Sequence, residues 1–226
     1  MQRHFCPPKF LKLKSDMKKN LLIAFVTASV IFTSCGETKT ETPAPAAPLT
    51  ALQGDAKLSV DATASKVIWS GNMTGTKSYS HSGTINLTSG NIELKEGKVV
   101  GGTLTIDMNS INPTDANYTA EQGHTTADLI GHLSSPDFFD IANNPTASFA
   151  VTAANGNSIS GNLTIRGKSN PETVEVSSIA LEGDNVRLKG KLTFDRQKYS
   201  VAFAMPVKDL ILADDISLEF DILAKK

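Results

Sequence analysis

The stretch GHLSSPDFFD, residues 131–140, decides how the rest of this 226-residue chain is interpreted. Pro136 followed by Asp137 predicts a turn or the start of a helix, because proline fixes its own φ angle and aspartate hydrogen-bonds the backbone amides that follow it. The adjacent Phe138 and Phe139 would point to opposite faces of a strand, whereas on a short helix or turn both can pack against a sheet. We therefore expect this stretch to close one end of a β structure.

The sequence on either side of this stretch alternates between apolar and polar residues. Leu104, Ile106 and Met108, for example, are separated by single polar residues. A period of two gives each strand one apolar and one polar face. Turn-forming residues separate the segments, and Ser89-Gly90-Asn91 is interpreted as one of these hairpin turns. The pattern breaks only near residues 115–140, where we expect a short helical excursion.

Antiparallel strands that each have one apolar face must close into a barrel or stack as a sandwich. A closed barrel of about eight strands has an interior that is filled by side chains or holds one small ligand. The alternation alone leaves both choices open: barrel against sandwich, and filled interior against hollow interior.

Several motifs together resemble the YceI-like family, whose central motif reads close to HLxSxDFF and is similar to residues 131–140. Four further landmarks of that family match in register: GGTLTID at 101–107, NPTASF at 144–149, GNLTIRG at 161–167 and FDR at 194–196. The resemblance covers roughly residues 57–224. It implies an all-β fold, an antiparallel lipocalin-like β-barrel of about eight strands, and therefore favours the barrel over the sandwich.

The resemblance also implies that a polyisoprenoid, a quinone or a similar long amphiphilic lipid binds inside the barrel. Each buried CH₂ group of such a chain contributes about 0.8 kcal/mol, so no catalytic group is needed to hold it. No cofactor is expected besides such a ligand. The residues expected to line the binding site are Trp69, Ile85, Leu87, Leu104, Ile106, Met108, Phe138, Phe139, Phe149, Val151, Leu163, Ile165, Phe194 and Phe203.

The sequence gives little support for catalysis. The four histidines show none of the HxH, HxxxH or HExxH spacings of metal sites, and no GxSxG elbow, phosphate-binding glycine loop or dinucleotide fingerprint is present. We therefore predict no catalytic residue and no metal site, and expect His81 and His132 to hydrogen-bond to backbone at the barrel rim. A hydrolase that uses these rim histidines is the alternative.

The charged residues indicate surface roles. Arg166 and Arg196 are expected in surface ion pairs, with contact to an anionic head group at the barrel mouth as the alternative. The chain contains 22 Lys+Arg and 23 Asp+Glu. Residues 1–34 hold six of the basic and one of the acidic residues, so the remainder carries 16 against 22, a net charge of about −6. This balance argues against a nucleic-acid partner.

The N-terminal region has the features of an export signal. Basic residues that follow Met17 precede the apolar run 21–32, which is shorter than the about 20 residues needed to span a membrane. The run ends in Phe-Thr-Ser-Cys-Gly, which resembles a bacterial lipobox with Cys35 as the acylated residue. We expect residues 1–35 to be an extension and lipoprotein signal peptide that starts at Met1 or Met17. Residues 36–52, rich in Pro, Thr and Ala, are expected to be a disordered tether, and 53–226 the barrel domain.

These features together predict an exported, lipid-anchored binding protein of the cell envelope. The membrane is then a partner through the N-terminal anchor, and Gly36 after the cysteine favours the outer membrane. A homodimer is a further expectation that the sequence leaves open. The alternative function is a cell-envelope stress or interaction module whose barrel is solid.

Overall fold

A computed structural model of the protein describes residues 54–75, 78–117, 125–204 and 210–226, all within one compact unit, Ala44–Lys226. The expected signal peptide, anchor cysteine and tether lie outside the described residues. Most of the described chain is antiparallel strand: β1 (Ala56–Val60), β2 (Lys66–Gly75), β3 (Tyr79–Lys95), β4 (Lys98–Pro113), β5 (Thr146–Asn155), β6 (Ser158–Ile165), β7 (Lys168–Glu182), β8 (Asn185–Asp195) and β9 (Leu210–Lys225). The described helices are α1 (Thr126–Ser134) and a 3-10 turn, η2 (Arg196–Tyr199). Neither has the length and apolar content to cross a membrane.

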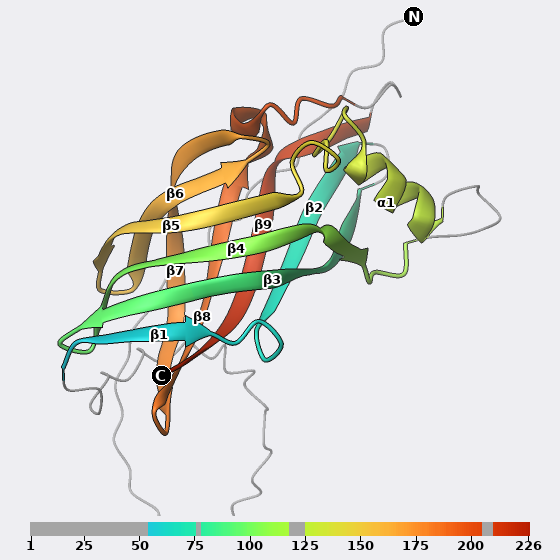
Figure 1. Cartoon of the computed structure of the whole chain (residues 1–226). Coiled ribbons are helices and arrows are strands. Elements are labelled where there is room, and N and C mark those ends of the chain that lie inside the picture. The colour runs from blue at the N-terminus through green and yellow to red at the C-terminus, as the bar shows by residue number, and fades with distance from the viewer. Residues whose placement is uncertain (1–53, 76–77, 118–124, 205–209) are drawn as a thin grey trace, which may run out of the picture. The chain divides into compact units, whose positions relative to one another are not determined.

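The strands close into a ring of eight positions (Figure 1). The order around the ring is β2-β9-β8-β7-β6-β5-β4-β3, and β3 pairs with β2 to complete it. β1 lies between β3 and β9, the two strands that also flank β2. It pairs with the C-terminal part of β3 and the C-terminal end of β9. The expectation of an antiparallel lipocalin-like barrel of about eight strands is confirmed.

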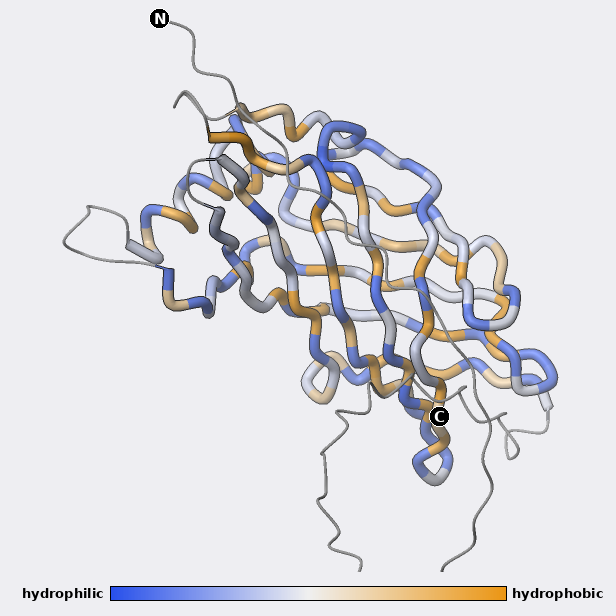
Figure 2. The backbone as a smooth tube through the Cα atoms, turned by 180° about the vertical axis from the view of Figure 1, so that it is seen from behind, coloured by the Kyte–Doolittle hydropathy of each residue, from blue (hydrophilic) through white to orange (hydrophobic). Residues whose placement is uncertain are grey.

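Apolar and polar residues alternate along the strands, as the orange and blue segments of the tube in Figure 2 show. In β8, for example, Leu192 and Phe194 are buried, whereas Thr193 between them is exposed. The expected period of two is therefore present, and the inward side chains of all the strands form one core.

The turn expected at Ser89-Gly90-Asn91 is wrong, because these residues lie inside β3. Gly90 pairs with Leu104 of β4, and a Cβ atom there would lie 2.8 Å from the carbonyl oxygen of Thr103. The glycine thus permits a close approach of two strands and a register shift nearby rather than a reversal of the chain. The actual β3–β4 turn is Glu96-Gly97, where both residues have positive φ.

Two further glycines leave room for aromatic rings in the barrel wall. A Cβ atom on Gly83 would lie 2.7 Å from the Trp69 ring and 2.2 Å from the carbonyl oxygen of Asn112. A Cβ atom on Gly161 would lie 2.4 Å from the ring of Phe149. The absence of a side chain at these glycines therefore fixes where the two rings pack.

Helix α1 lies at the barrel end where β2 and β4 finish (Figure 1). Thr125 begins it with a capping box, because its hydroxyl accepts a hydrogen bond from the Asp128 amide and the Asp128 carboxylate accepts one from the Thr125 amide. The helix ends before Pro136, which cannot continue it. The chain then turns through hydrogen bonds from the amides of Phe138 and Asp140 to the Ser135 carbonyl. The expected helical excursion is thus α1 followed by a turn.

Candidate functional site

The barrel interior contains two apolar cavities that lie end to end. The cavity beside α1, here called the helix-side chamber, has a volume of about 160 Å³. The second, here called the far chamber, has a volume of about 90 Å³ and includes Ile92 and Val99 near the β3–β4 turn. Four residues line both chambers, so they separate one from the other: Val67, Ile106, Leu163 and Leu218.

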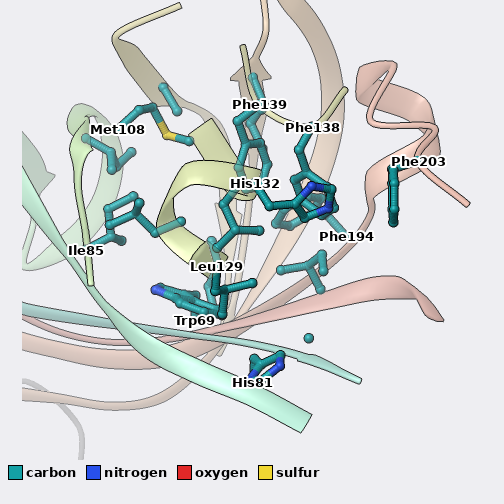
Figure 3. A pocket seen from close by; sticks show the side chains of 18 of the residues that line it. Trp69, His81, Ile85, Met108, Leu129, His132, Phe138, Phe139, Phe194 and Phe203 are labelled. Carbon is teal, nitrogen blue, oxygen red and sulfur yellow. The ribbon is translucent and has the colours of Figure 1, made fainter. Parts of the chain in front are cut away.

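The helix-side chamber is enclosed by strands on several sides and by α1 with the turn that follows it (Figure 3). Leu129 and His132 enter from α1, and Trp69 from β2. The Trp69 indole donates a hydrogen bond to the Thr84 carbonyl over 3.2 Å. Because this N–H group is already satisfied, Trp69 presents an apolar ring to the chamber.

All fourteen residues expected from the sequence to line the site lie in the walls of these chambers. Those of the helix-side chamber are Trp69, Ile85, Met108, Phe138, Phe139, Ile165, Phe194 and Phe203. Those of the far chamber are Leu87, Leu104, Phe149 and Val151, while Ile106 and Leu163 line both. The structure thus brings the whole set together around one interior.

Sequence reasoning missed other wall residues, above all those of α1. Leu129 and Leu133 are four residues apart, so they lie on one face of the helix, with His132 beside them. This spacing was present in the sequence but was too short to stand out next to the strand pattern. Leu212 and Ile216 of β9 were also missed, although they continue the alternation toward Leu218.

The chamber has a mouth at the α1 end. Its wall residues there are half-buried, as are Ile106 and Leu218 between the chambers, whereas Leu163 and Phe194 are buried. We define the mouth by Met73, His81, Leu129, His132, Phe203 and Leu212.

His81 at this mouth is oriented by a carboxylate. Its Nδ1 atom lies 3.3 Å from Oδ1 of Asp115, and the same carboxylate accepts a hydrogen bond from the Ser82 amide over 2.9 Å. The ring of Tyr79 contacts the imidazole edge-on, with 5.4 Å between the ring centroids. His81 therefore has an ionisable side-chain partner at the rim.

His132 is surrounded by aromatic rings instead. Its imidazole meets the Phe203 ring at 4.4 Å and the Phe138 ring at 5.4 Å between centroids, both edge-on. Within the described part of the chain, these ring contacts take the place of the backbone hydrogen bond that we expected. His132 is therefore a polar group at the edge of an apolar wall (Figure 3).

The two arginines expected in surface ion pairs have structural roles near the mouth, which corrects that expectation. Arg166 donates hydrogen bonds to the carbonyl oxygens of Phe138 and Ser200, both over 2.7 Å, and to that of Pro136 over 3.1 Å. Its guanidinium thereby fastens the turn that carries Phe138 and Phe139 to the end of β6.

Arg196 is only 2 % exposed. It donates hydrogen bonds to the carbonyl oxygens of Val201, Phe203, Leu212 and Ala213 and to the carboxylate of Asp214. Burial lowers the pKa of its guanidinium, while the charge of Asp214 opposes that effect. The side chain therefore joins the segment that carries Phe203 to the start of β9, so that both form one wall of the mouth. Only the Asp214 contact is an ion pair of the expected kind.

The chemistry available in the chambers is that of an apolar binding site. No lysine, arginine, aspartate or glutamate among the described residues lines either chamber. The described residues also contain no cluster of three or more potential metal ligands. Such walls favour an apolar chain and disfavour a buried charge.

Several known proteins are similar to this chain in sequence or in fold. The UPF0312 protein of Pseudomonas aeruginosa PAO1 is 38% identical over 86 residues, which make up 36% of this chain and only 39% of that protein. A UPF0312 protein of Staphylococcus epidermidis is 28% identical over 123 residues, 50% of this chain and 71% of that protein. The crystal structure of BcnA from Burkholderia cenocepacia shares the fold, with a TM-score of 0.55 at 23% identity over 74% of this chain and 99% of that one.

The model of the YceI-like domain family matches residues 58–224, from the middle of β1 to the end of β9. This match includes every strand and the whole wall of both chambers. The chain therefore belongs to the YceI-like family.

Proposed function

We propose that this protein is a non-catalytic binding protein that holds one long, uncharged isoprenoid-like lipid inside the barrel. The observation that carries the proposal is the pair of end-to-end apolar chambers, whose described walls contain no lysine, arginine, aspartate or glutamate. An apolar chain gains about 0.8 kcal/mol for each CH₂ group that it buries. The chambers also favour this function over an interaction module with a solid barrel.

The wall chemistry narrows the head group of the ligand. A diphosphate carries several negative charges, and burial of an unpaired charge is costly. A hydroxyl or carbonyl needs only one hydrogen-bond partner. His132 offers such a partner at the mouth, where its ring borders the chamber between Phe138 and Phe203. We therefore expect an alcohol or quinone head at the mouth and the chain below it.

The single tryptophan makes this proposal measurable, because Trp69 lies in the wall of the helix-side chamber. Titration of the full chain with geranylgeraniol should change the fluorescence of Trp69. Geranylgeranyl diphosphate should bind at least about tenfold more weakly, a difference of about 1.4 kcal/mol. His132→Leu should weaken binding of the alcohol by up to about tenfold, since a hydrogen bond contributes about 0.5–1.5 kcal/mol. Tighter binding of the diphosphate than of the alcohol would contradict the proposal.

We also propose that the mature chain is anchored to the outer membrane through a lipid on Cys35. The proposal is supported by the basic and apolar residues that precede this cysteine and by the lipobox-like sequence around it. Bacteria that express the chain in the presence of labelled palmitate should produce labelled protein in the membrane fraction. Cys35→Ala should abolish the label, whereas Cys6→Ala should not. Equal labelling of the two variants would exclude Cys35 as the site.

A further inference from the structure

We infer that the four residues between the two chambers set the length of the chain that the barrel binds. These residues, Val67, Ile106, Leu163 and Leu218, are here called the girdle. The inference rests on the proposed function and adds a specificity determinant to it. A short ligand fills the helix-side chamber alone, whereas a longer ligand passes the girdle and places its tail in the far chamber.

The girdle narrows the interior from two opposite walls. Val67 and Leu218 come from β2 and β9, which are neighbours in the ring. Ile106 and Leu163 come from β4 and β6, which lie on either side of β5 and across the barrel from the first pair. All four are aliphatic, so a prenyl or acyl chain can pass between them without desolvating a polar group.

The residues that line the far chamber suit the apolar end of a ligand chain. Ile159, Val174 and Leu188 are buried apolar residues of its wall. Asn91 and Thr103, the polar side chains that border it, are hydrogen-bonded to each other over 2.9 Å. Because this hydrogen bond already engages one polar group of each side chain and the rest of the wall is mostly apolar, the far chamber suits an apolar tail better than a head group.

The two chambers together are deep enough for one extended ligand. Met108 lines the helix-side chamber and Val99 lines the far chamber, and both lie on β4. At about 3.3 Å per residue their separation along the strand is about 30 Å. With a strand tilt of about 40° this corresponds to about 23 Å along the barrel axis. A ligand with its head at His132 can therefore pass the girdle only with the later part of its chain.

Affinity measurements along a series of prenyl alcohols test this inference. In the wild type, the change in Trp69 fluorescence should give an affinity that rises from geraniol to farnesol to geranylgeraniol. We expect at least about a tenfold gain for each added five-carbon unit that is buried, or about 1.4 kcal/mol. Trp69 lines only the helix-side chamber, so it reports binding of short and long alcohols alike.

Substitutions that block the path should remove the gain for the longest alcohol. Val174→Phe, whose site lines only the far chamber, should also leave geraniol binding within about threefold. Ile106→Phe and Leu218→Phe narrow the girdle, and Val174→Phe fills the far chamber itself. Val100→Phe is the matched control, because Val100 lies on the same strand as Ile106, is 48% exposed and borders neither chamber. It should keep the full length dependence.

A widened girdle gives an independent test that requires no additional bulk in the core. Ile106→Ala should speed the association of geranylgeraniol at least about threefold more than that of geraniol in stopped-flow measurements. The inference is overturned if the blocking variants keep the wild-type gain with chain length, or if the wild type shows no gain. A failure of every alcohol to bind the wild type would instead refute the proposed function.

Discussion

At the scale of single residues, the mouth is held in place by two arginines, of which Arg196 is buried and Arg166 half-buried. Arg166 fastens the turn after α1, and Arg196 fastens the segment that carries Phe203. Neither role could be inferred from the sequence. The residues around an arginine at a strand end can be the same whether its side chain faces water or donates hydrogen bonds to several acceptors. The acceptors here are mostly backbone carbonyls from distant segments, and carbonyls leave no signature in the residue types.

Replacement of Arg196 tests this role. Arg196→Ala removes the donor to four buried or half-buried carbonyl oxygens and leaves them without their partner. We expect the free energy of unfolding to fall by about 3 kcal/mol in urea titrations. Arg196→Lys should recover only part of the loss, since an ammonium cannot reproduce the planar fork of donors. Lys198→Ala, which removes a neighbouring exposed cation, should change the stability by less than about 0.5 kcal/mol.

The same limit applies to the histidines. Sequence analysis placed His81 and His132 together at the rim, and both do line the mouth. Their partners differ because Asp115 reaches His81 from the end of β4, whereas two phenylalanines surround His132. These contacts depend on how separate segments meet, so a local pattern around each histidine could not distinguish them.

At the scale of elements, the strands were predictable and one turn was not. Alternation in segments such as Leu104 to Met108 identifies the inward face, because the period of two is a property of the strand itself. Gly90 was assigned to a turn because glycine favours turns, yet it lies where β3 and β4 approach closely. Glycine is suited both to a turn and to a close approach of two strands, so the residue type alone does not distinguish these roles. The position of the neighbouring strand does.

A closely packed glycine, Gly83, and a glycine with open space around it, Gly131, give a prediction at the scale of elements. Gly83→Ala places a methyl group 2.2 Å from the Asn112 carbonyl oxygen and 2.7 Å from the Trp69 ring. We expect a loss of about 3 kcal/mol of stability and a shifted Trp69 emission spectrum. Gly131→Ala lies in α1 with open space around the new methyl group, and alanine favours the helix by up to about 1 kcal/mol.

Thermal unfolding followed by circular dichroism measures both variants in one experiment. The two substitutions should move the midpoint in opposite directions, Gly83→Ala downward and Gly131→Ala upward. Equal midpoints for the two variants would show that the close packing of β2, β3 and β4 around Trp69 contributes nothing to stability.

At the scale of the whole molecule, many of the residues that line the interior were predictable but the division of the interior was not. Family resemblance and alternation together placed fourteen residues, and all of them face one of the chambers. Alternation assigns a side chain to the inside of the barrel but does not give its position along the barrel axis. The girdle arises from the stagger of four strands around the ring, which only the three-dimensional structure displays.

Mass spectrometry of organic extracts shows whether the barrel carries an uncharged long-chain lipid. The full chain would be purified without detergent from its native bacterial host, and its extract compared with that of the Val174→Phe variant. The proposed function predicts about one uncharged long-chain isoprenoid per wild-type protein and a clear decrease in the variant. A folded wild-type protein that yields no such lipid, or that yields a stoichiometric charged lipid instead, would contradict it.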